Sequence, residues 1–234
     1  MSGFVRVVDI ETSGLPEDEQ HAICEIGWVD VDLETLVVRN PVTFLVNPGH
    51  PIPPHIRAVH HIGDDMLANA LFPDQAVKRL LSGVDEGGYL AAHRASFEQA
   101  FIEAPGRNWI CTWKCALRAW QDVVSHSNQS LRYSLGIDAD PGFDTSAAMP
   151  PHRALPDALV TAYILRRLLQ LRPVDRLVEI SKEIPLTIHI GFGKHKGAKW
   201  SEVPEDYLRW IADKSDMDAE TKAQAKHWLG KRAA

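Results

Sequence analysis

The stretch Phe4-Val5-Arg6-Val7-Val8-Asp9-Ile10-Glu11-Thr12-Ser13-Gly14-Leu15 decides the fold, because it joins a Val-rich run to two acids and a turn. Residues 4–9 have the apolar, β-branched composition of a buried strand, and residues 12–14 are typical of a turn. Side chains alternate along a strand, so Asp9 and Glu11 lie on the same side of it. The sequence therefore predicts a buried strand that ends at a pair of carboxylates.

Further strands and helices are predicted on either side of a break near residue 73. Residues 22–31 and 36–46 are strand-like runs joined by a polar segment, which predicts a hairpin and, with the first strand, an antiparallel meander. From residue 73 the patterns predict strands at 89–92 and 109–111, and helices that start near residues 73, 96, 113 and 155. The helix from residue 113 is predicted to end near residue 123, and Pro173 is predicted to end the long helix from residue 155. Strands first, then strands alternating with helices, indicate an α/β protein with a mixed sheet flanked by helices.

Composition is that of an ordinary globular protein, with 234 residues, 45% apolar and 24% charged. The net charge of −6 argues against coat-like binding of nucleic acid, but not against a nucleic-acid enzyme that brings metal ions. Residues 182–234 hold 10 Lys and Arg against 8 Asp and Glu, which leaves 15 against 23 for residues 1–181. We therefore predict a large domain of residues 1–181 and a small C-terminal domain of residues 182–234, with Pro185 in the linker.

The cysteine count indicates a cytoplasmic protein. Cys24, Cys111 and Cys115 are an odd number of thiols, which is typical of reduced cysteines rather than a disulfide framework. The N-terminus lacks a signal-peptide pattern, and no apolar run approaches the ~18 residues of a membrane span. We expect no membrane partner.

Two later segments place acids at predicted helix starts. In residues 92–98 a strand passes into a helix whose first turn carries Glu98, and in residues 152–157 His152 precedes a helix that carries Asp157 in its first turn. Each segment alone is ordinary, because an acid in a first turn complements the helix dipole and a single histidine is more often structural. Together with the acidic pair of the first strand, they predict a cluster of four carboxylates and one histidine.

These three segments resemble the three exonuclease motifs of the DEDDh family of 3′–5′ exonucleases: Val8-Asp9-Ile10-Glu11-Thr12-Ser13-Gly14-Leu15, Ala92-His93-Arg94-Ala95-Ser96-Phe97-Glu98 and His152-x4-Asp157. Residues 109–114, 152–155, 192–197 and 207–210 are similar to the exodeoxyribonuclease X group of that family, so the resemblance covers nearly the whole chain. It implies a ribonuclease H-like fold with a small C-terminal domain. It also implies a metal-dependent 3′–5′ exodeoxyribonuclease that releases 5′-mononucleotides, in DNA repair or recombination.

The resemblance also assigns roles to the acids. Asp9, Glu11 and Asp157 are expected to bind two Mg²⁺ ions, for which Mn²⁺ can substitute, Glu98 to complete the metal shell, and His152 to act as the general base. Four carboxylates and two divalent ions cancel in charge, so the loaded site accepts a phosphodiester that the metal-free site would repel. The ions lower the pKa of a coordinated water and stabilise the attacking and leaving oxygens. An ordinary imidazole, with a pKa of ~6.5, can accept a proton near neutrality.

Two positions depart from the family pattern. Glu98 stands where motif two usually ends in Asp, and its side chain is one methylene longer but can reach the same metal. Arg94 stands where Asn usually follows the motif-two histidine, and it either contacts a substrate phosphate or pairs with a nearby acid. We favour the ion pair for Arg94.

Further residues are expected at the substrate. Thr12, Leu15 and His60 are predicted contacts, with Leu15 either a wedge against the terminal base of a fraying end or a core residue. In the C-terminal segment lysines interleave with glycine and aromatic residues, which is typical of a surface that contacts phosphates. We expect the lysines of this segment, Lys194, Lys196 and Lys199, to bind DNA, and its aromatic residues, Trp200, Tyr207 and Trp210, to form a core.

The expected partner is the 3′ end of single- or double-stranded DNA. A 3′–5′ exoribonuclease is the alternative, because these motifs bind phosphates and metals without reading the sugar. The chain could also be a non-catalytic DNA-binding or polymerase-associated module. The presence of His152 together with all four acids argues against that last reading.

Overall fold

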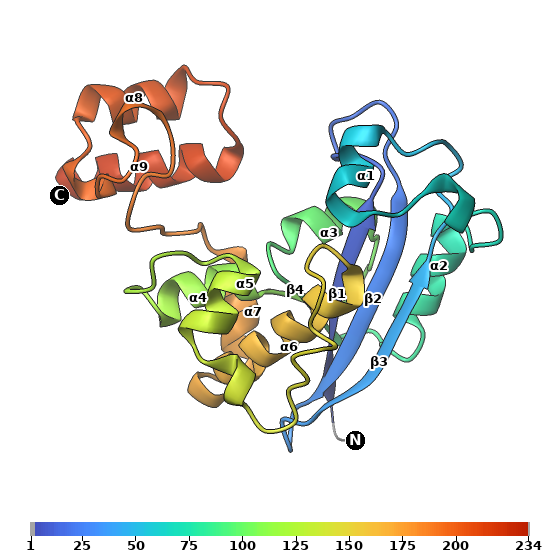
Figure 1. The fold of residues 1–234 in the computed structure, drawn as a ribbon. Helices are drawn as coiled ribbons and strands as arrows, with labels where there is room; N and C mark the ends of the chain where they lie inside the picture. Colours follow the sequence, from blue (N-terminus) through green and yellow to red (C-terminus); the bar gives the residue numbers. More distant parts are fainter. Residues whose placement is uncertain (1–2, 234) are drawn as a thin grey trace.

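The computed structural model describes residues 3–233, so Met1 and Ser2, which belong to the N-terminal segment examined for a signal peptide, lie outside the described residues. The five predicted strands are present in the predicted order, and so are the helices predicted to start near residues 73, 96, 113 and 155 (Figure 1). The strands are β1 (Phe4–Thr12), β2 (Ile23–Asp32), β3 (Val38–Leu45), β4 (Tyr89–Ala92) and β5 (Asn108–Cys111). The α-helices are α1 (Pro54–His60), α2 (Pro73–Leu81), α3 (Ser96–Phe101), α4 (Thr112–Ala119), α5 (Asn128–Ser134), α6 (Ala154–Leu171), α7 (Val174–Lys182), α8 (Glu205–Asp213) and α9 (Ala219–Ala233).

The strands form one sheet in the order β3-β2-β1-β4-β5. Strands β1, β2 and β3 pair antiparallel, whereas β4 and β5 extend the sheet parallel to β1. This confirms the predicted meander and the mixed direction of the sheet. It also places the carboxyl end of β1 beside the carboxyl end of β4, where the first and second motifs can meet.

Alternation along β1 divides its side chains between two hydrophobic cores. Val5 and Val7 pack in the core that contains buried residues of α6, and Val8 and Ile10 pack in the core on the other face with residues of α2. Asp9 and Glu11 continue the series of Val5 and Val7, so they lie on the α6 face of the sheet. The long helix that carries the third motif therefore covers the same face as the acidic pair (Figure 1).

Several helices were not expected from the sequence patterns. Helices α1, α5, α7, α8 and α9 are absent from the prediction, and α4 ends at Ala119, before the predicted end at residue 123. Pro173 ends the long helix as expected, but it also stands at the N-cap of α7. Proline is compatible with a helix start because its missing N–H is not needed there.

The C-terminal part has a hydrophobic cluster of its own, which includes Ile190, Trp200 and Leu208. In Figure 1, α8 and α9 lie apart from the sheet and are joined to it by the segment after α7. The prediction that Trp210 belongs to the core is wrong, because this residue is 43% exposed, with its ring stacked on that of Tyr207. The division of the chain at residues 181 and 182 stays a proposal. Within residues 3–233 we find no helix with the length and apolarity that a bilayer crossing requires.

Candidate active site

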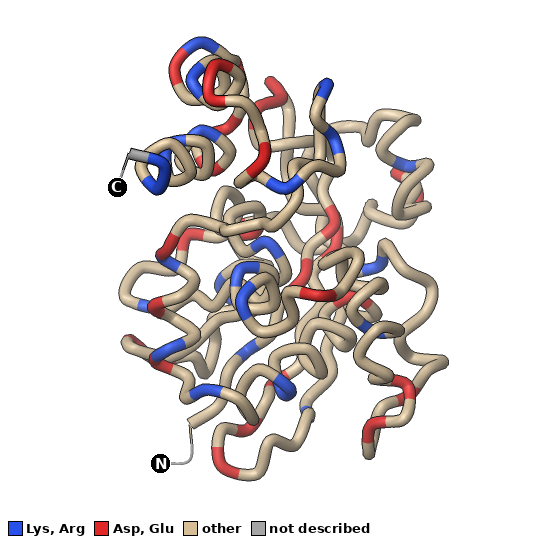
Figure 2. The backbone as a smooth tube through the Cα atoms, turned by 90° about the vertical axis from the view of Figure 1, so that its left-hand side faces the viewer, with Lys and Arg blue, Asp and Glu red and all other residues tan. Residues whose placement is uncertain are grey.

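Three of the four predicted carboxylates converge at the end of β1. One oxygen atom from each of Asp9, Glu11 and Asp157 lies within 4.8 Å of the others. Asp9 and Glu11 come from β1, and Asp157 comes from the first turn of α6. Oxygen ligands of this kind are those that Mg²⁺ and Ca²⁺ bind. Several acidic positions lie together in the middle of the molecule in Figure 2.

Glu98 supplies the fourth carboxylate from α3. Its side chain is only 3% exposed, and its Oε2 atom has no hydrogen-bond partner among the described residues. A buried, unpaired carboxylate oxygen is costly unless a cation or another group satisfies it. The residues present therefore fit a divalent cation, with Glu98 close enough to Asp9 for the two charges to interact.

The metal-free cluster holds protons at neutral pH. Burial, and then the Coulomb field of Asp157 and Glu25, raise the pKa of Glu11 to about 8. Burial raises the pKa of Glu98 to about 8, with a smaller contribution from Glu11. Burial and four neighbouring carboxylates also raise the pKa of Asp9 well above its ordinary value. A bound divalent cation would offset the repulsion among these carboxylates, because its charge reverses the sign of the local electrostatic field.

These shifts predict that the metal-free protein loses stability as pH rises. The unfolded chain releases its carboxyl protons near pH ~4.5, whereas folded Glu11 and Glu98 keep theirs up to about pH 8. The folded state therefore binds more protons between these pH values, and the free energy of unfolding falls with pH. Melting in EDTA at pH 7.0, 7.5 and 8.0, above the range in which the buried His93 loses its proton in the unfolded chain, should show a decreasing Tm, by about 2–4 °C per kcal/mol lost. A divalent ion should remove most of this slope, and a Tm in EDTA that rises over the same range would contradict the prediction.

The third motif is held by α5, which sequence patterns missed. The backbone N–H of His152 donates to Asp157 Oδ2 at 2.8 Å, and the Gln129 amide donates to Asp157 Oδ1 at 3.1 Å. Asn128 donates to the backbone oxygen of Asp157 at 3.2 Å. The carboxylate is thereby oriented, while the imidazole of His152 is exposed to solvent beside it. His152 has a positive φ of 61°, which turns the chain sharply just before α6.

His93 of the second motif has a structural role. Nδ1 of His93 lies 2.9 Å from Thr112 Oγ1, and Nε2 lies 2.8 Å from the backbone oxygen of His126. Burial lowers the pKa of His93 to about 4, so it is neutral at physiological pH. These two contacts tie the segment before α3 to the start of α4 and to the loop before α5, and so help to fix the helix that carries Glu98.

Glu25 is a fifth buried carboxylate that sequence patterns did not single out. It is 2% exposed and lies opposite Glu11 in the pairing of β1 with β2. The guanidinium of Arg153 donates to both of its oxygens, at 2.9 and 2.5 Å. The available signal was that two acids, Glu25 and Asp30, interrupt the otherwise apolar run of residues 22–31.

Of the predicted substrate contacts, Leu15 is exposed and His60 is not. The Leu15 side chain is 49% exposed beside the acidic pair, which favours the wedge over the core reading. The prediction for His60 is wrong, because this residue is 1% exposed, its Nδ1 accepts the N–H of Ile62, and its Nε2 lies 3.7 Å from Cys24 Sγ. The Thr12 hydroxyl is buried and donates to the Gly14 oxygen at 2.7 Å, which leaves only backbone atoms for a substrate contact.

Arg94 forms no ion pair within residues 3–233, so the favoured pairing with an acid is wrong. Its guanidinium lies over the ring of Trp113, 4.3 Å from the centroid. Both residues line a groove of about 590 Å³ whose other wall includes His189 and Phe192 from the C-terminal part. Lys194, Lys196 and Lys199 are exposed on the same C-terminal segment.

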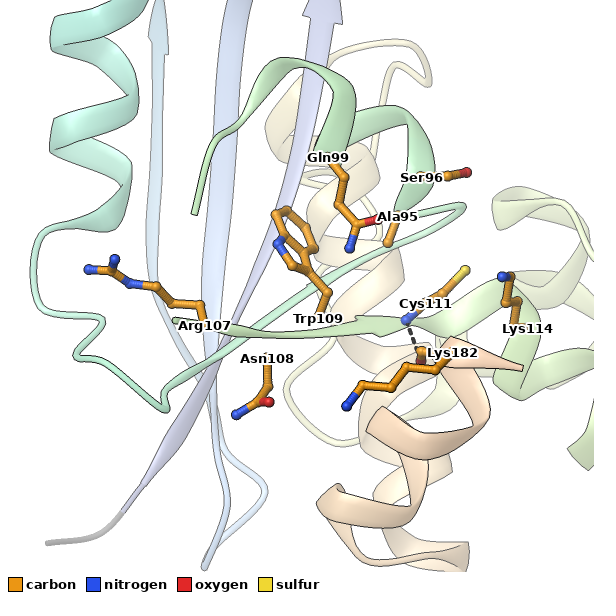
Figure 3. A pocket seen from close by; sticks show the side chains of 10 residues that line it. Ala95, Ser96, Gln99, Arg107, Asn108, Trp109, Cys111, Lys114 and Lys182 are labelled. Atoms are coloured by element: carbon orange, nitrogen blue, oxygen red, sulfur yellow. Dashed lines mark hydrogen bonds between the residues drawn. The ribbon is translucent and has the colours of Figure 1, made fainter. Parts of the chain in front are cut away.

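A second hollow of about 350 Å³ lies along β5 (Figure 3). Its walls carry Arg107, Trp109 and Lys182, and none of the five predicted catalytic residues lines it. In Figure 3 the Arg107 side chain points away from Cys111, whose backbone N–H donates to Ser181 Oγ at 2.8 Å. The hollow is therefore separate from the acidic cluster.

Comparison with known proteins identifies the family. The family model described as exonuclease matches residues 7–165, which hold all three motifs. The chain belongs to the exonuclease family. It is 32% identical to exodeoxyribonuclease 10 of Escherichia coli K12 over 97% of this chain and 99% of that protein.

Solved structures agree with this assignment. The exonuclease matches exonuclease X in complex with 5′ overhanging duplex DNA with a TM-score of 0.62 and 29% identity, over 76% of this chain and 99% of that one. It also shares its fold with the nuclease domain of 3′hExo, described as a DEDDh family member bound to rAMP, with a TM-score of 0.58 and 20% identity over 72% of this chain and 92% of that one. The predicted ribonuclease H-like α/β fold and the hydrolase class of this exonuclease are thereby confirmed.

Proposed function

We propose that this exonuclease is a 3′–5′ exodeoxyribonuclease that uses two Mg²⁺ ions, or Mn²⁺ in their place, and releases nucleoside 5′-monophosphates from DNA ends. The observation that carries the proposal is the convergence of Asp9, Glu11 and Asp157 within 4.8 Å, with Glu98 buried nearby. The similarity to exodeoxyribonuclease 10 and to the DNA complex of exonuclease X supports DNA as the substrate. The three free cysteines support a cytoplasmic location. A role in DNA repair or recombination is proposed from the similarity to exodeoxyribonuclease 10.

Each residue has a role that its geometry permits. Asp9, Glu11, Glu98 and Asp157 would hold the ions, which supply charge neutralisation and activate water when bound. His152, exposed beside Asp157, would take the proton from the attacking water. The hydrogen bond from its backbone N–H to Asp157 keeps the base next to the metal ligand.

Contacts with the DNA strand complete the proposal. Arg94, free of ion pairs within the described residues and exposed at the groove, would bind a backbone phosphate. Lys194, Lys196 and Lys199 would add phosphate contacts from the C-terminal part. The backbone of Thr12 and the side chain of Leu15 would meet the terminal nucleotide.

The function is tested with 5′-labelled DNA and RNA oligomers of one sequence, single and double stranded, in Mg²⁺ and in EDTA. We expect a ladder that shortens from the 3′ end on DNA, in Mg²⁺ only. Cleavage of RNA at an equal or higher rate would assign the chain to the exoribonucleases. Cleavage in EDTA, or no cleavage of any oligomer, would reject the proposed mechanism.

Leu15→Ala should slow the digestion of blunt duplex by about 10-fold relative to single strands, because a half-exposed leucine contributes roughly 1.5 kcal/mol of apolar contact to a frayed base. The measurement is the ratio of the two initial rates. Leu171→Ala is the matched control, since Leu171 is an exposed leucine at the far end of α6. An unchanged ratio for Leu15→Ala would remove the wedge from the proposal.

A further inference from the structure

We propose that Glu25 is a positioning residue for the reaction, which acts through Arg153 to fix where α6 begins and hence where His152 and Asp157 stand. The inference rests on the proposed function, because it concerns the geometry of the base and of a metal ligand in that mechanism. Glu25 itself is not expected to touch the substrate.

The carboxylate of Glu25 joins β2 to the start of α6. Its Oε2 accepts the N–H of Ala154, the first residue of α6, at 2.9 Å and the Arg153 Nε at 2.9 Å. Its Oε1 accepts Arg153 Nη2 at 2.5 Å. The first N–H groups of a helix have no partner within the helix, so a buried acid supplied by another element is an effective cap. The side chain of Arg153, at the N-cap of α6, makes no such capping hydrogen bond itself.

Gly27 supplies a second, steric contact between the same two elements. A Cβ atom at Gly27 would lie 2.3 Å from the backbone nitrogen of Leu155 and 2.4 Å from the carbonyl carbon of Ala154. The backbone of α6 therefore presses directly on β2 at this residue, and only glycine leaves room for it. In the pairing of the strands Gly27 lies opposite Asp9, and Glu25 lies opposite Glu11.

The contact of Arg153 with Glu25 lies between His152 and Asp157, the two functional groups of the third motif. Arg153 immediately follows His152 and precedes Asp157 by four residues, and its side chain turns inward to Glu25 while the imidazole of His152 is exposed. The hydrogen bond from the His152 N–H to Asp157 spans the same turn. A shift of the Arg153 backbone would therefore move the base and the ligand together, relative to the acids of β1.

Burial explains why this pair is sensitive to substitution. Charged partners that are removed from water cost free energy when one of them is lost, because the other is left uncompensated. Glu25→Gln keeps the shape but removes the charge that holds Arg153. We expect kcat on DNA to fall by about 10–100-fold, the usual effect of losing a group that orients a metal ligand, with little change in KM.

The matched control is Asp30→Asn. Asp30 lies on the same strand, is equally buried, and forms a comparable pair with Arg6 at 2.9 and 3.1 Å, but it faces the opposite side of the sheet. Both substitutions remove one buried carboxylate that is paired with arginine. Asp30→Asn should therefore lower stability without lowering kcat of the folded enzyme.

Four readouts separate positioning from stability. Urea unfolding measures the folded fraction, and digestion of a DNA oligomer in Mg²⁺ gives kcat and KM. Electron paramagnetic resonance on the metal-free protein measures its affinity for added Mn²⁺. We expect Glu25→Gln to weaken Mn²⁺ binding by about 10-fold and Asp30→Asn to leave it unchanged. Gly27→Ala, which changes no charge, should also lower kcat. The double variant Glu25→Gln, Arg153→Gln should lose no more than the worse single variant, because both act through one contact.

The inference and the proposed function fail in different ways. If wild-type protein shows no Mg²⁺-dependent digestion of DNA, the proposed function is wrong. If the wild type is active and Glu25→Gln keeps its kcat and its Mn²⁺ affinity, only the role of Glu25 is wrong. An equal loss of kcat in Asp30→Asn at the same folded fraction would also overturn it. Should Glu25→Gln fail to fold, Arg153→Gln, which removes the other partner of the same pair, carries the test.

Discussion

Asp9→Ala is expected to lower kcat for DNA digestion by at least about 10³-fold, because a lost metal ligand removes several kcal/mol of charge stabilisation. Asp9 is the carboxylate whose charge interacts with all four of its acidic neighbours. Its removal therefore disturbs the site at its centre. Initial rates on a single-stranded oligomer in saturating Mg²⁺ measure the effect.

The fold should survive this change and gain stability when metal is absent. Burial and four like charges raise the pKa of Asp9, so its ionised form is unfavourable in the metal-free protein. Asp9→Ala and the isosteric Asp9→Asn should melt in EDTA at or above the wild-type temperature, but gain less from added Mg²⁺. Wild-type activity in either variant would reject the metal site, and a lower Tm in EDTA would reject the electrostatic explanation.

His152→Asn is expected to lower kcat by about 10²–10⁴-fold, the usual contribution of a general base. Asparagine is chosen because it tolerates the positive φ of 61° at this position, so backbone strain does not enter the result. The imidazole is exposed and forms no side-chain hydrogen bond within residues 3–233. We therefore expect an unchanged Tm and unchanged Mn²⁺ affinity.

The pH profile distinguishes a base from a residue that only binds substrate. The kcat of His152→Asn should depend more steeply on hydroxide concentration than the wild-type kcat, because hydroxide would replace the missing general base. Added imidazole should restore part of the rate. A variant that keeps the wild-type profile, with only KM raised, would assign His152 to binding.

Local sequence patterns were enough to predict the acidic cluster and the strands of the sheet. A strand alternates with period two, so Asp9 and Glu11 had to share a face wherever that strand packs. An acid in the first turn after a strand is carried to the strand's carboxyl end, which is why Glu98 was found. Helices α1, α5 and α7 were not predicted, because they are short and their formation depends on packing more than on their own hydrophobic periodicity.

Arg94 and Trp210 show what composition alone cannot separate. An arginine beside acids can pair with them or lie on an aromatic ring, and the fold puts Trp113 beneath it. A helix with Trp210 on one side and Leu208 on the other buries only the face that meets α9. The environment of Arg94 is therefore set by a neighbour that is distant in sequence, and the exposure of Trp210 is set by which face of α8 is covered.

The sequence by itself determined the three exonuclease motifs, and it predicted the strands and helices of an α/β protein and the acidic pair of β1, because each of these depends on a short motif or on spacing within one strand or one helix turn. Only the tertiary structure decided that His60 is buried against Cys24 and that Glu25 holds Arg153. The physical reason is that the interacting residues are far apart in the sequence. Glu25 and Arg153 are 128 residues apart, and whether a buried acid is paired or orphaned depends on which distant backbone the fold brings to it.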